Sequence, residues 1–154
     1  MRFSARTLRR GMRWWPPFLG AGIRVRSLTD DFREAVVELR SRRLNRNLFG
    51  THFGGSLYSM TDPFYAIMLL HNLGPEYLVW DQSGAIEYLT PGRGTVTARF
   101  ALTEARLEEI RAQAAAGEKV LPEFDIDIVD EAGTVVARAH KTIYVRLKQR
   151  HRPQ

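Results

Sequence analysis

The stretch NLFGTHFGGSLYSMTDPFYAIMLL, residues 47–70, determines how the rest of the chain is interpreted. Its large apolar residues recur three, four and seven positions apart, which is typical of a helix with one broad buried face. They are Leu57, Met60, Phe64, Ile67 and Met68. Gly74 and Pro75 then provide a stop signal. The stretch therefore predicts a long buried helix with two glycines at its start and an acid in its middle.

Two interpretations of Asp62 follow from the proline beside it. Asp62 followed by Pro63 is a typical N-cap with proline at the first helical position, so a new helix would begin there and Asp62 would have a structural role. The apolar spacing instead continues across Pro63 without a change of phase, which favours one longer, kinked helix. On that second interpretation Asp62 needs a partner or a chemical function.

The flanking segments alternate apolar and polar residues, which is typical of half-buried strands. We expect strands over 23–28, 32–40, 77–89, 95–102, 123–129 and 134–147, with a candidate interruption of the third at Ser83 and Gly84. Shorter helices are expected over 4–15 and between Thr103 and Gly117. A curved antiparallel sheet of about six strands wrapped around the long helix is the economical packing, which is an α+β hotdog fold.

One charged residue breaks the apolar face of the last predicted strand. Lys141 falls among Val135, Ala137, Ala139 and Ile143, which share that face. It marks either a β-bulge or a cation directed at a group in the interior.

Composition limits the kind of protein that this chain can be. Its 154 residues fit one domain, 1–154, and no apolar run reaches the ~20 residues that cross a bilayer, so we expect a soluble protein. The chain has no cysteine, which excludes disulfides, thiolate nucleophiles and cysteine-ligated metals. This composition is compatible with a bacterial cytoplasm, and we expect a cytoplasmic location.

The net charge of +6 is concentrated at two basic ends, residues 1–13 and 148–154. The first end contains no acid, and its arginines are Arg2, Arg6, Arg9, Arg10 and Arg13. Such ends bind nucleic acids or membrane surfaces, serve as mitochondrial transit peptides, or are simply solvated faces. Charge runs are weak signals, so we favour the solvated face and expect no specific nucleic-acid partner and no membrane partner.

The helix start has the features of a site for a polarised carbonyl. Gly54 and Gly55 let a ligand approach the free N–H groups of the first turn, and Asp62 is suited to activate water or to attack a carbonyl. Eight residues separate Gly54 from Asp62, about 12 Å along a helix axis. If both groups act on one carbonyl, they must come from two protomers, which requires a dimer.

Histidine is the other candidate for chemistry. His52 is placed to act as a base or as an orienting group, although a lone histidine is more often structural. His71 and His140 lack companions at ligand spacing, so we expect no metal site. No Walker or dinucleotide fingerprint is present, and we expect no cofactor.

The entrance to the helix resembles that of the phenylacetyl-CoA-type hotdog thioesterases. The chain as a whole also resembles a bacterial hotdog family of unknown function that is usually labelled as thioesterases. This second resemblance rests on three segments, WPPFLGAGI, GTHFGGSLYSMTDPFY and YLVWD…PGRG. The resemblance covers roughly residues 10–146. It implies that Asp62 is the nucleophile or general base, that the Gly54 N–H polarises the thioester carbonyl, and that Asn47 positions the reacting groups. The family usually has His-Gly-Gly, whereas Phe53 precedes the glycines here and the histidine is one position earlier, which leaves the role of His52 open.

The resemblance implies an acyl-CoA thioesterase that acts as a homodimer or homotetramer, with its site at the subunit interface. Further substrate contacts are expected from Gly55, Ser56 and Phe53, and from Arg93 and Arg99 toward the phosphates of coenzyme A. Because Phe53 stands where the family usually has histidine, an alternative is a non-catalytic hotdog module that binds acyl-CoA or lipid. A hotdog dehydratase is a weaker third hypothesis, because no suitable histidine–acid pair is evident.

Overall fold

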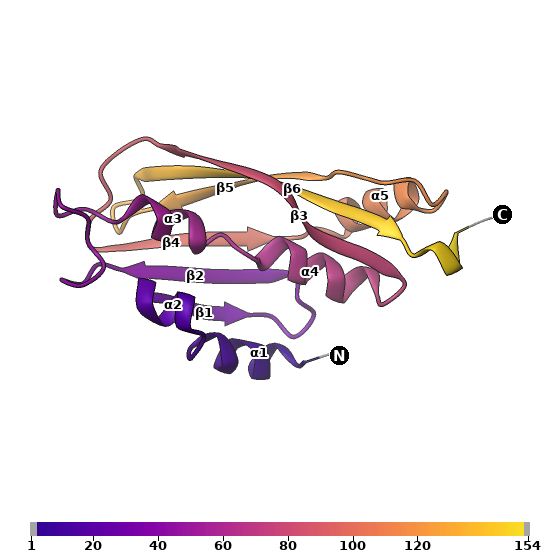
Figure 1. Ribbon diagram of the computed structural model, residues 1–154, viewed down its shortest axis with the longest axis horizontal. Coiled ribbons are helices and arrows are strands. Elements are labelled where there is room, and N and C mark those ends of the chain that lie inside the picture. Colours follow the sequence, from indigo (N-terminus) through magenta and orange to yellow (C-terminus); the bar gives the residue numbers. More distant parts are fainter. Residues whose placement is uncertain (1–2, 153–154) are drawn as a thin grey trace.

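A six-stranded antiparallel sheet forms the body of the protein, in a computed structural model that describes residues 3–152 (Figure 1). Arg2 and the last two residues of the basic tail lie outside the described residues. The strands are β1 (Ile23–Leu28), β2 (Glu34–Arg40), β3 (Tyr77–Tyr88), β4 (Thr95–Ala101), β5 (Glu123–Val129) and β6 (Val135–Leu147). Their order across the sheet is β1-β2-β4-β5-β6-β3, so β1 and β3 are its edges.

The buried helical layer lies against one face of this curled half-barrel and consists of α3 (Gly54–Ser59) and α4 (Phe64–Leu73) (Figure 1). Its apolar side chains join the inward residues of the strands in one core, and Phe64 packs on Phe100 of β4 with ring centroids 4.8 Å apart. Tyr65 stacks on Phe124 of β5 at 3.9 Å. The hotdog fold predicted from the alternation and the apolar helix is confirmed.

The central helix is interrupted rather than kinked, so the prediction of a continuous helix through Pro63 was wrong. Residues 60–63 separate α3 from α4, because Pro63 has no N–H to donate and its ring crowds the preceding turn. The capping interpretation is wrong as well. Pro63 itself occupies the N-cap of α4, no side chain caps that helix, and the carboxylate of Asp62 bonds elsewhere.

Two short helices precede the sheet where one was predicted. α1 (Ala5–Met12) is capped by Ser4, whose side chain accepts from the Thr7 amide, and α2 (Pro16–Ala21) follows it. Proline at the first helical position needs no N–H partner, which is why Pro16 begins α2. Gly22, with a φ of 82°, ends it in the left-handed region. Both helices lie beside β1 (Figure 1).

The remaining elements are one helix and one short 3₁₀ turn. α5 (Glu104–Ala114) begins at its predicted cap, Thr103, and a short 3₁₀ turn (Gln149–His151) follows β6. The predicted interruption of the third strand is a register shift between Asp81 and Ser83 within a continuous β3. No helix among residues 3–152 is both long and apolar enough to cross a membrane.

Candidate active site

Asn47 closes the loop that leads into α3. Its side-chain nitrogen donates to Thr51 Oγ1 at 2.8 Å and to the His52 carbonyl at 3.1 Å, while its side-chain oxygen accepts from the amides of Phe49 and Thr51 at 2.9 and 3.1 Å. These four bonds use the two donors and two lone pairs of the amide. Asn47 therefore fixes the approach of the chain to the helix and has no bond left for a ligand.

His52 joins this loop to the turn before β4. Its side chain is 3% exposed, its Nε2 lies 3.1 Å from the Gly94 carbonyl, and its amide donates to the Gly92 carbonyl at 3.0 Å. Burial lowers the pKa of His52, and the charge of Arg46 adds to this effect although the Gly94 carbonyl opposes it. Because a carbonyl only accepts, Nε2 carries the proton and Nδ1 is a buried lone pair without a partner in the described part of the chain.

This burial predicts a pH dependence of stability that His52→Gln should reduce. The lowered pKa means that the unfolded chain binds a proton at His52 that the folded chain does not, so stability falls as the pH drops below about 6.5. Glutamine keeps a donor for Gly94 but does not titrate. We expect the urea-unfolding free energies of wild type and variant to converge from pH 7.5 to pH 5. If the two plots of unfolding free energy against pH are parallel, His52 does not contribute to the pH dependence of stability.

The start of α3 offers two unused backbone donors. The N–H groups of Gly54 and Gly55 have no acceptor within residues 3–152, and Phe53 supplies no side-chain cap. These are the positions at which a helix leaves its N–H groups unsatisfied. They are available to a carbonyl oxygen.

A groove of about 590 Å³ lies in front of this helix start. It is lined by five of the predicted site residues, Asn47, His52, Phe53, Gly54 and Gly55. Tyr88, at the end of β3, also lines the groove, and a Cβ on Gly54 would lie 2.8 Å from its Oη. The missing side chain therefore lets the tyrosine hydroxyl approach the helix start. No local sequence pattern marks Tyr88, because only the sheet places it there.

The side chain of Phe53 partly covers the second glycine. A Cβ on Gly55 would lie 2.5 Å from the Phe53 ring, which is itself exposed. Both residues also line a neighbouring groove of about 440 Å³, to which the buried Ser56 contributes. The aromatic ring that replaces the expected histidine thus separates two grooves at the helix start.

The two arginines predicted to contact substrate occupy different places. Arg93 Nη1 donates to the Gly50 carbonyl at 3.4 Å, so Arg93 lies beside the loop that carries Asn47. Arg99 is exposed on β4 and does not line the groove, since its neighbours Ala98 and Phe100 occupy the buried face of the strand.

Asp62 belongs to a separate cluster, outside the groove that Gly54 lines. Lys141 Nζ donates to Asp62 Oδ1 at 3.0 Å and lies 3.0 Å from Asp81 Oδ1. The lysine side chain is 4% exposed, whereas those of Asp62 and Asp81 are 44% and 27% exposed. The ammonium also lies 4.9 Å from the ring centroid of Tyr58. Of the two alternatives for Lys141, the inward-directed cation is correct, and the irregularity is in β3.

The electrostatics of this cluster keep the lysine charged. Burial lowers the pKa of Lys141, but its hydrogen bonds and attraction to Asp81 and Asp62 outweigh burial and raise the pKa above 10.5. Burial raises the pKa of Asp81, and the charge of Asp62 adds to this while Lys141 opposes it. One buried cation therefore serves two carboxylates, of which Asp62 is the more accessible to solvent.

A family model matches residues 4–145 of this chain. The chain belongs to the family described as Domain of unknown function (DUF4442). A search of the curated proteins finds no match. No group of three or more metal-ligating side chains occurs in this DUF4442 chain between residues 3 and 152.

Several solved structures share the fold of this DUF4442 protein. A Pseudomonas aeruginosa protein of unknown function, described as a probable thioesterase, matches with a TM-score of 0.85 and 16% identity over 96% of this chain and 99% of that chain. A Haemophilus influenzae thioesterase matches with a TM-score of 0.67 and 16% identity over 96% and 93% of the two chains. A thioesterase from Pseudomonas aeruginosa matches with a TM-score of 0.68 and 15% identity over 96% and 97%. At these identities the likeness establishes the hotdog fold.

Proposed function

We propose that this DUF4442 protein hydrolyses acyl-CoA thioesters, in the manner of the phenylacetyl-CoA-type hotdog thioesterases. The observation that carries the proposal is that one chain offers both two unused N–H donors, at Gly54 and Gly55, and, in a separate cluster, an accessible carboxylate, Asp62, held by a buried cation. The fold is shared with proteins described as thioesterases. The arrangement supplies a place for the carbonyl oxygen and a group that activates water.

In the proposed reaction the thioester carbonyl oxygen accepts hydrogen bonds from the Gly54 and Gly55 N–H groups, which stabilise the negative charge that develops on it. Asp62 takes a proton from water, and the resulting hydroxide attacks the carbonyl carbon. The carbon–sulfur bond then breaks, the thiolate leaves and takes up a proton, and a carboxylic acid is released. In the second form of the mechanism Asp62 attacks the carbonyl itself, the carbon–sulfur bond breaks and the thiolate leaves and takes up a proton. Water then hydrolyses the mixed anhydride, which releases the carboxylic acid and regenerates Asp62.

Two protomers are needed to bring these groups together. In one chain the groove is lined by Gly54 and not by Asp62, so we propose that Asp62 serves the site that begins at Gly54 of a second protomer. The loop before the groove exposes three large apolar side chains, Leu44, Leu48 and Phe49, which a partner or substrate would cover. Within the described residues β3 pairs only with β6, which leaves an edge for a second copy. We therefore propose a homodimer or a homotetramer.

Phe53 favours the alternative function. Its ring lies against Gly55, where a bound acyl thioester would have to displace it or pack on it. A non-catalytic module that binds acyl-CoA or lipid in this groove would need neither free access to the N–H groups nor Asp62.

A panel of acyl-CoA esters, from short to long chains and including aromatic acids, distinguishes the two functions. We expect release of free thiol from at least one ester, measured with a thiol reagent. In sedimentation experiments we expect an assembly of two or four chains. Saturable binding of acyl-CoA without thiol release, by a folded protein, would reject the hydrolase in favour of the binding module. Arg93, beside the loop that carries Asn47, is the residue proposed to meet the coenzyme phosphates.

A further inference from the structure

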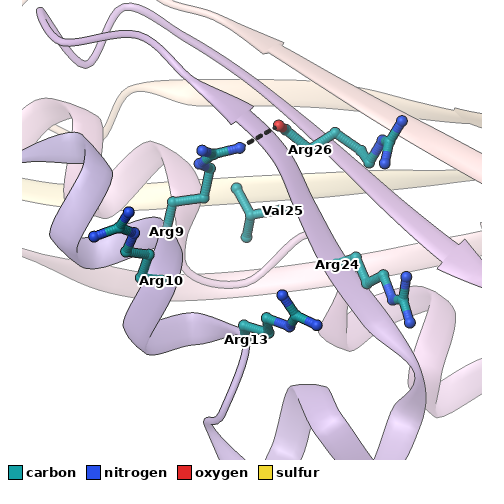
Figure 2. Close-up of a pocket in the computed structure, with 6 residues that line it drawn as sticks. All are labelled: Arg9, Arg10, Arg13, Arg24, Val25 and Arg26. Carbon is teal, nitrogen blue, oxygen red and sulfur yellow. Dashed lines mark hydrogen bonds between the residues drawn. The ribbon is translucent and has the colours of Figure 1, made fainter.

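Five arginines line one groove beside the edge strand β1 (Figure 2). The groove is about 320 Å³ and lies between α1 and β1. The arginines that line it are Arg9, Arg10, Arg13, Arg24 and Arg26. The sequence pattern showed a basic first helix, but the two arginines of β1 join it only in the folded chain. The first 29 residues contain no acid.

Few of these charges are neutralised by the protein. Arg26 Nε lies 3.1 Å from Glu38 Oε1. Arg9 Nη1 donates to the Arg26 carbonyl at 3.0 Å, which ties α1 to β1 (Figure 2). Within residues 3–152, Arg10, Arg13 and Arg24 take part in no ion pair. An uncompensated group of guanidinium ions attracts phosphate groups.

The same helix borders an apolar groove of about 480 Å³. It is lined mainly by apolar side chains, Phe3, Leu8, Met12, Trp14, Trp15 and Pro63. Trp14 is 69% exposed, and the side chains of Phe3, Trp15 and the nearby Leu19 are also exposed. Large exposed apolar groups of this kind indicate a surface that another phase or molecule covers.

The arginine groove and the apolar groove lie on the two flanks of α1, with the exposed side of the helix between them. Ala5 and Met12 face the core, whereas Arg6 and Arg10 lie four positions apart on the exposed side of α1. The Arg13 guanidinium lies 5.7 Å from the ring centroid of Trp14, which joins the two grooves. A nucleic acid or a free phosphate would use the arginines but would leave the aromatic side chains in water. An anionic lipid surface accommodates both, because arginines contact headgroups and tryptophan is favoured at the bilayer interface.

We propose that α1, the following Trp14-Trp15 pair and the arginines of β1 form a docking surface for a bilayer that contains anionic phospholipid. The protein would lie on the membrane and not cross it. Five arginines and the exposed aromatic residues supply the two signals, electrostatic and apolar, that reversible membrane binding needs. This proposal differs from the expectation from sequence that the chain has no membrane partner, and vesicle binding decides between the two.

Flotation of the full chain with vesicles tests the proposal. We expect binding to vesicles of equal parts phosphatidylcholine and phosphatidylglycerol, and little binding to phosphatidylcholine alone. Each arginine near an anionic surface is worth about a fivefold change in partition, so Arg10→Ser with Arg24→Ser should reduce binding about 25-fold. The matched control, Arg42→Ser with Arg43→Ser, removes the same charge from an exposed loop and should change binding less than the α1–β1 pair.

Two further measurements separate the apolar from the electrostatic contribution. Trp14→Ser should weaken binding to the anionic vesicles, and high salt should abolish the binding that remains. In a Trp80→Phe background, which leaves Trp14 and Trp15 as the only tryptophans, lipids brominated in their acyl chains should quench the fluorescence. Equal binding to neutral vesicles, equal effects of the two arginine pairs, or no quenching would overturn the proposal. Binding to soluble polyphosphate without vesicle binding, or dimerisation that buries Trp14 and excludes vesicles, would also overturn it.

Discussion

Asp62→Asn should abolish thiol release from acyl-CoA while the protein remains folded. We expect a loss of about a thousandfold in turnover, since an amide neither takes a proton from water nor attacks a carbonyl. Asparagine still offers an oxygen to Lys141, and no helix cap depends on Asp62, so the free energy of unfolding should change by less than about 1 kcal/mol. Single-turnover thiol release and urea unfolding of the same preparations measure both quantities.

Asp81→Asn is the matched control for this experiment. It removes the second carboxylate that contacts the same lysine, and Asp81 is the more buried of the two. We expect it to keep at least about a tenth of the activity, because it acts through Lys141. The proposal is wrong if Asp81→Asn abolishes thiol release and Asp62→Asn does not. Equal losses of stability and activity in Asp62→Asn would assign the residue a structural role.

The sheet could be predicted because its strands repeat one local rule. In 95–102 and 123–129 every second residue is apolar, and these segments became β4 and β5 with that face in the core. The break at Pro63 was missed because the apolar residues of α3 and α4 share one buried face although the two helices are separate. Periodicity reports which side chains are buried, and it does not report whether the backbone between them is continuous.

The candidate site could be proposed from sequence only where neighbours in the chain compose it. Gly54, Gly55 and Asp62 stand in one short motif, and Lys141 was conspicuous because a cation occupied an apolar position. Asp81 gave no such signal, since its contact with Lys141 depends on the pairing of β3 with β6 and on the register shift beside it. Such long-range contacts follow from the register of the sheet, which no local pattern encodes.

Lys141→Met should be the most destabilising substitution in this cluster. Methionine has a similar length, but it leaves Asp62 and Asp81 facing each other without a cation. We expect a loss of about 2–3 kcal/mol, less than for a fully buried pair because water screens the half-exposed Asp62. The raised pKa of Lys141 means that its contribution is complete below about 10.5 and is lost as the pH rises through the folded value, so wild type and variant should converge above that pH.

Repulsion and lost packing predict different second-site effects, which decides the cause of the loss. If repulsion between carboxylates is responsible, Asp81→Asn in the Lys141→Met background should restore about half of the stability, and the deficit should shrink at acid pH because the pKa of Asp81 is already raised by burial. Lys119→Met, an exposed lysine, should change stability by less than about 0.5 kcal/mol. A deficit that neither Asp81→Asn nor acid relieves would instead come from the lost contact with Tyr58, and the lysine would then support the fold rather than the charge of Asp62.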